Sequence, residues 1–120
     1  MSQKTLKEWL QSTSDVLFPA ELGDAEVHIN STDCDGDTPL HVLIRRNETA
    51  GALMLIENGA PVNAAGDMGE TPLHVAVSNK NMTVIDALLK RGARTDIANE
   101  YGKTALERAV EERITLFGTS

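Results

Sequence analysis

The chain has 120 residues, of which 41% are hydrophobic, and its 18 acidic side chains against 11 lysines and arginines give a net charge of −7. This length and hydrophobic content support a single folded domain with one core and exclude a disordered chain. The negative charge disfavours binding to nucleic-acid backbones and to anionic membranes.

The compartment is indicated by what the sequence lacks. No stretch is apolar enough to cross a membrane, and the first residues lack the apolar run of a secretory signal peptide. The single cysteine, Cys34, has no partner for an internal disulfide, so we expect a reducing compartment. These features predict a cytoplasmic protein.

One phrase recurs along the chain at a step of 33 residues: Thr-Pro-Leu-His stands at 38–41 and 71–74, and Thr-Ala-Leu-Glu at 104–107. The same step backwards from Thr38 leads to Thr5. Self-similarity at such a period is typical of stacked-repeat proteins. It favours a protein that holds a partner over one that catalyses a reaction.

Each copy of the phrase predicts a helix start. A threonine hydroxyl can accept a hydrogen bond from a free amide of the first turn, and proline suits the first helical position. The residue three positions later can reach back to the threonine, as glutamate does in a capping box. That place holds His41 and His74 in two copies, and Glu8 and Glu107 in the others. We therefore interpret the two histidines as caps rather than as catalytic or metal-binding groups.

A second helix is predicted after each complete phrase, over residues 49–58 and 82–91. Apolar residues at helical spacing mark the first helix of each pair, and a polar break separates it from the second. Gly59 and Gly92 then stand where a helix end takes a left-handed residue. The segment that follows, which contains a further glycine, is long enough for a projecting turn.

These residues resemble the ankyrin repeat, a helix–turn–helix of 33 residues that carries the Thr-Pro-Leu-His phrase and ends in a hairpin-like finger. The resemblance is close over residues 33–113 and weak over 5–31. It implies an all-α solenoid of stacked helix pairs with projecting finger loops, forming one domain. Its expected parts are a divergent N-terminal capping repeat (1–32), two repeats (33–65 and 66–98) and a truncated C-terminal capping repeat (99–120).

The inner part of the chain departs from the family's pattern at two kinds of position. Asn47 and Lys80 occupy the turn between the helices, where the family favours glycine. Asparagine tolerates that backbone better than lysine does. Gly51 and Ala52 make the second helix of one copy unusually small on its packing face.

The ends depart further. Pro19 interrupts the second helix of the first copy, so a distorted cap is expected there, with Trp9 and Phe18 covering the exposed side of the stack. After one helix over 104–113, we expect a hydrophobic lid because a solenoid must cover its last repeat. The residues available for this lid are Ile114, Leu116 and Phe117.

The sequence predicts no metal, cofactor or catalytic site. Asp33, Asp35 and Asp37 alternate as in a calcium loop, but Thr38 and Ile44 stand where that loop needs glycine and glutamate. One cysteine and three scattered histidines give no zinc-binding spacing. There is also no phosphate-binding glycine loop and no nucleophile elbow.

The resemblance implies a partner-binding surface made of the fingers and the exposed positions of the first helices. The acids gather in the expected fingers, which either aids solubility or forms a row of acidic tips that faces a basic partner. Tyr101 is either an interface anchor or packs along its own finger. The implied finger positions are Cys34, Asp35, Asp37, Asp67, Met68, Glu70, Glu100, Tyr101 and Lys103, and the implied helix positions are Arg45, Arg46, Ser78, Asn79, Glu111 and Glu112.

We therefore predict a non-catalytic protein-binding module that works as an adaptor or inhibitor of a basic protein. One form would be an immunity-type protein that neutralises a basic enzyme such as a nuclease. We expect it to be a monomer. The alternative is an assembly protein that forms a homodimer through its short C-terminal end.

Overall fold

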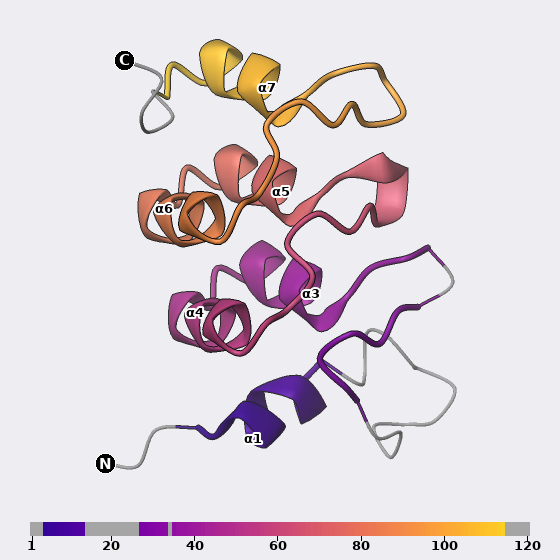
Figure 1. The fold of residues 1–120 in the computed structure, drawn as a ribbon, viewed down its shortest axis with the longest axis vertical. Helices are drawn as coiled ribbons and strands as arrows, with labels where there is room; N and C mark the ends of the chain where they lie inside the picture. Colours follow the sequence, from indigo (N-terminus) through magenta and orange to yellow (C-terminus); the bar gives the residue numbers. More distant parts are fainter. Residues whose placement is uncertain (1–3, 14–26, 34, 115–120) are drawn as a thin grey trace.

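The computed structural model describes residues 4–13, 27–33 and 35–114 (Figure 1). Its helices are α1 (Leu6–Gln11), α3 (Pro39–Arg45), α4 (Thr49–Glu57), α5 (Pro72–Ser78), α6 (Met82–Lys90) and α7 (Ala105–Glu111), with a short 3₁₀ turn, η2 (Asp67–Gly69). The described part of the chain contains no strand, and its β pairing is limited to one isolated antiparallel bridge between Ala98 and Thr104.

The helices form two rows, and the loops between the pairs project to one side as fingers (Figure 1). In the first row α5 packs between α3 and α7, and in the second row α6 packs on α4. Within each pair, α3 contacts α4 and α5 contacts α6. The stack runs along the longest dimension of a molecule that measures 44 × 35 × 20 Å. The predicted all-α solenoid is confirmed.

The recurring threonines begin the helices as predicted. Capping boxes with hydrogen bonds in both directions join Thr5 to Glu8, Thr38 to His41, Thr71 to His74 and Thr104 to Glu107. The interpretation of the two histidines as caps is therefore confirmed.

Each histidine also joins its repeat to the next one. The Thr38 amide donates to His41 Nδ1 at 3.1 Å, and because an amide can only donate, that nitrogen carries no proton. His41 Nε2 therefore carries it and donates to the Glu70 carbonyl at 2.8 Å. In the next repeat His74 Nε2 lies 3.0 Å from the Lys103 carbonyl.

The core lies between the two rows of helices. Leu40, Leu43 and Ile44 of α3 are fully buried, and their counterparts on α5 are equally buried. From the second row, Leu55 and Leu88 face inward without exposure. Burying one such side chain stabilises the fold by about 1.5–3 kcal/mol, so this stripe supplies much of the stacking energy.

The residues that end the second helices adopt the left-handed backbone conformation that the sequence predicted for them. Gly59 and Gly92 end α4 and α6 with φ of 90° and 85°. Asn47 and Lys80 in the turns between helices also have positive φ, 58° and 56°. Lysine in this conformation costs about 1 kcal/mol, so Lys80 is a strained position.

At the N-terminal end, Trp9 covers the stack, and its ring explains why α4 carries a small residue on its packing face. A Cβ atom added to Gly51 would lie 2.5 Å from Trp9 Cε3, so only glycine leaves room for the indole ring. Lys4 Nζ lies over the same ring, 4.6 Å from its centre. The prediction for Trp9 is confirmed, while Phe18 and Pro19 lie outside the described residues.

At the other end, Ile114 packs partly buried against the core, and its amide donates to the Ala109 carbonyl at 2.8 Å. The other two residues of the predicted lid, Leu116 and Phe117, lie outside the described residues. The longest helices in the described ranges have nine residues, and none of them could span a membrane.

Candidate protein-binding surface

Side chains at the base of the first and third fingers brace the backbone of each tip. Asp33 Oδ1 accepts hydrogen bonds from the amides of Asp35 at 2.8 Å and Asp37 at 3.0 Å. Asn99 occupies the same repeat position and accepts from the amides two and four residues later, at 2.9 and 3.0 Å. The alternating acids of the first finger are thus part of a braced turn.

The fingers also contact one another. The Asp67 amide donates to Asp37 Oδ1 at 2.9 Å, and the Glu100 amide donates to the Met68 carbonyl at 2.9 Å. A Cβ atom on Gly66 would lie 2.2 Å from Asp37 Oδ1, so the approach of the second finger to the first requires glycine. The three fingers therefore form one continuous surface.

The ends of the fingers expose a mixed apolar and acidic surface, which we call the tip patch. The Met68 and Tyr101 side chains are 42% and 67% exposed, and the Tyr101 hydroxyl lies 3.8 Å from Met68 Sδ. Tyr101 thus contacts the neighbouring finger rather than only its own. The tip patch consists of Asp35, Asp67, Met68, Glu100 and Tyr101, all of them exposed.

Asp37 turns away from the tips and pairs with the inner helix row. It is 5% exposed, and its carboxylate lies 2.6 Å from Arg45 Nη1. Burial opposes ionisation of this carboxyl, but the hydrogen bonds from Arg45 and the Asp67 amide outweigh it and hold the pKa of Asp37 below its usual value. Asp37, which was predicted to contact a partner, is therefore already bound to Arg45 and the Asp67 amide of its own chain.

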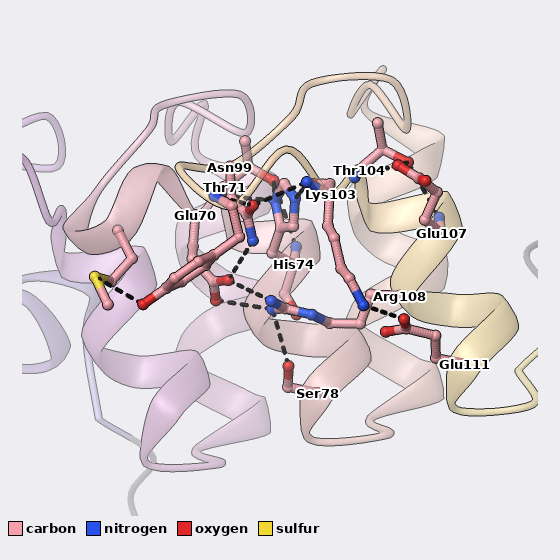
Figure 2. A network of polar contacts seen from close by, with 12 residues as sticks. Glu70, Thr71, His74, Ser78, Asn99, Lys103, Thr104, Glu107, Arg108 and Glu111 are labelled. Atoms are coloured by element: carbon pink, nitrogen blue, oxygen red, sulfur yellow. Dashed lines mark hydrogen bonds and ion pairs between the residues drawn. The ribbon is translucent and has the colours of Figure 1, made fainter.

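Glu70, at the equivalent position of the second finger, pairs with the following repeat instead (Figure 2). Its carboxylate lies 2.5 Å from Arg108 Nη2 and accepts a hydrogen bond from Asn99 Nδ2 at 3.1 Å. Burial alone would raise the pKa of Glu70. The hydrogen bonds from Arg108 and Asn99 outweigh the effect of burial, so the pKa of Glu70 is below its usual value. Arg108 also donates to Ser78 Oγ at 3.1 Å.

The third finger reverses the signs of the first. Lys103 pairs with Glu111, eight positions later (Figure 2). Asp37 pairs with Arg45 over the same spacing, with the charges exchanged. Lys80 lies 3.6 Å from Glu112 in the same region. The inner face of the first helices is thus lined by ion pairs within the molecule.

The remaining predicted contact residues have structural partners or fall outside the description. Arg46 Nη1 donates to the Ser12 carbonyl at 3.0 Å. Asn79 Nδ2 donates to the Ile44 carbonyl at 2.6 Å and so joins two repeats. Cys34 lies outside the described residues.

Sequence reasoning missed Arg108 and Asn99. The signal for Arg108 was present, because Val42 and Val75 occupy its position in the other copies. A charge in place of a buried valine indicates a specific partner at that level of the stack. Asn99 was overlooked because it lies before the finger positions that the resemblance singled out.

No site for a metal is found in the described ranges, where no three histidine, cysteine, aspartate or glutamate side chains gather as ligands. His41 and His74 are fully buried, and both ring nitrogens of each lie within 3.1 Å of backbone partners. The two histidines are therefore engaged in structural hydrogen bonds.

Comparison with protein families supports this architecture. The family model described as ankyrin repeats (3 copies) matches residues 9–99 and 55–116, which together span most of the chain. A search of curated proteins found no match. The chain therefore belongs to the ankyrin-repeat family, whose repeats mediate protein–protein interaction.

Proposed function

We propose that this chain is a non-catalytic adaptor or inhibitor that binds a basic protein, in the cytoplasm, through its tip patch. The observation that carries the proposal is the exposed pair of Met68 and Tyr101 beside three exposed acids. Members of the ankyrin-repeat family are in general interaction modules without catalytic activity, which agrees with this assignment.

The chemistry of the patch fits a partner with lysine or arginine next to apolar side chains. Tyrosine is a common anchor at interfaces, and the flexible thioether of Met68 adapts to uneven surfaces. Asp35, Asp67 and Glu100 add negative charge that would attract a basic partner and speed its association. Lys103, the basic residue of the third finger, is paired with Glu111 and leaves this charge largely uncompensated.

The inner helix face has less to offer a partner. Asp37 and Glu70 already hold arginines, and a partner that took over either arginine would leave a largely buried carboxylate without its counterion. We therefore assign the principal contacts to the tips. The exposed inner positions Arg45, Ser78 and Glu111 would line the edge of the interface. Substitutions at an interface edge have small effects on the affinity for the partner.

The first test is capture of a partner from native lysate, at low and high salt, with identification by mass spectrometry. The tagged wild type is compared with Met68→Ala/Tyr101→Ala, and Asp86→Asn on the exposed side of α6 is the matched control. We expect a basic protein that is released by salt, lost with the tip variant and kept by the control. A partner kept by both variants would contradict the assignment.

A further inference from the structure

The C-terminal end of the stack exposes apolar side chains that the inner repeats bury. Leu106 and Val110 on α7 are 42% and 70% exposed, whereas Leu73 and Val77, one repeat earlier, are completely buried. In that earlier repeat α6 packs against α5, but no helix in the described residues packs in this way against α7. The apolar side of α7 is therefore uncovered in the described part of the chain.

The neighbouring helix α6 extends this surface. Thr49 Oγ1, at the start of α4, accepts a hydrogen bond from Asn81 of the following repeat at 2.9 Å, so this repeat position points toward the C-terminal end. Met82 holds the same position on α6 and is 45% exposed. We call Met82, Leu106 and Val110 the end face.

Charges of opposite sign flank the end face. Glu107 occupies the position of His74, whose ring reaches the following repeat at the Lys103 carbonyl. Arg113 occupies the position of Lys80, which pairs with a glutamate of the following repeat. By this equivalence Glu107 and Arg113 both lie toward the open end, on either side of Val110.

We propose that the end face binds the end face of a second copy, around a two-fold axis close to Val110. In this arrangement the two α7 helices run antiparallel, so that Glu107 of each copy lies beside Arg113 of the other. A closed two-fold pair is self-complementary in both apolar contact and charge.

The dimer is tested by sedimentation equilibrium of the full chain over a range of concentrations. Val110→Glu places a charge on the axis and should raise the dissociation constant about a hundredfold. Because Val110 is largely exposed, this variant should fold, which circular dichroism checks. Tyr101→Glu is the matched control, since Tyr101 is exposed to a similar degree at the finger tips, and it should leave the dissociation constant unchanged.

The register is tested by mixing two charge variants. Arg113→Glu and Glu107→Lys should each weaken the homodimer by repulsion, whereas their mixture should form a heterodimer in which both pairs are restored. Because Glu107 also caps Thr104 at the start of α7, circular dichroism first checks that Glu107→Lys folds. Mutual rescue supports the antiparallel arrangement, and its absence contradicts it.

The other occupant to distinguish is the chain's own segment 115–120. If that segment covered the end face, the full chain would sediment as a monomer and truncation after Ile114 would produce a dimer. That outcome overturns the proposal, as would a monomer at every concentration or equal effects of Val110→Glu and Tyr101→Glu. A dimer that persists after truncation supports it.

Discussion

The inner helix face and the finger tips come from neighbouring positions of the same repeats, yet their charges behave differently. On the inner face Asp37 and Glu70 are held by arginines and are largely buried. Asp35 and Asp67, which lie two and three positions before them, are exposed to solvent. The charge of a finger carboxylate is neutralised where an arginine of the first helix row lies within ion-pair distance of it. The same acidic composition therefore stabilises the stack in one row of positions and remains available to a partner in the other.

The largest loss of stability is expected where the first finger meets the second. Gly66→Ala would place a Cβ atom 2.2 Å from Asp37 Oδ1 and 2.9 Å from His41 Nε2, disturbing the ion pair and the histidine bond together. We expect a loss of about 3 kcal/mol in the free energy of unfolding, measured in urea. Gly102→Ala, which has open space but a φ of 79°, should cost only about 1 kcal/mol. Equal losses would contradict the buried contact.

The next largest loss of stability is expected when a finger acid that forms an ion pair is removed, in comparison with one that forms none within the described residues. Glu70→Ala leaves Arg108, whose side chain is 17% exposed, without its carboxylate, and should lower the free energy of unfolding by about 1–3 kcal/mol. Glu100→Ala at the tip should change it by less than about 0.5 kcal/mol. If the two variants unfolded alike in urea, the inner face would not be stabilised by its ion pairs.

Acid should weaken the inner face in two steps. Burial lowers the pKa of His41 in the folded chain, so on acidification the histidine takes up its proton in the unfolded chain first. The free energy of unfolding should therefore decrease as the pH falls below about 6.5. The pKa values of Asp37 and Glu70 are also below their usual range, so their contribution is complete above about pH 4.5 and is lost as the pH falls further. Urea unfolding across this range measures both steps.

A histidine variant isolates the first step. His41→Gln keeps a side chain that can cap the helix but has no group that titrates near neutral pH. Its stability should change less than that of the wild type between about pH 7 and about pH 5.5. An identical pH profile in both proteins would assign the first step to another group.

The smallest stability change is expected at the tips. Met68→Ala and Tyr101→Ala remove exposed side chains joined by one weak contact to sulfur, and each should alter the free energy of unfolding by less than about 0.5 kcal/mol. Thermal unfolding provides the check. A larger loss would mean that Tyr101 is a structural residue rather than an anchor for a partner.

The repeat register predicted the helices, their threonine caps and the glycines that end α4 and α6, because these depend on local hydrogen bonds that recur with the sequence. It did not predict which finger acids are free. That depends on single side chains such as Arg45, eight positions from Asp37, and Arg108, in the repeat after Glu70. The small residue Gly51 was visible in the sequence, but its reason, contact with Trp9, required the folded arrangement.

The most direct test of the account is calorimetric titration of the captured partner into two variants of similar stability. Met68→Ala/Tyr101→Ala changes the tips, and Glu111→Gln changes the exposed edge of the inner face. If the tips carry recognition, the first variant should bind about thirtyfold more weakly than the wild type and the second within about threefold of it. A large loss in Glu111→Gln with wild-type affinity in the tip variant would contradict the account and place the interface on the inner helices.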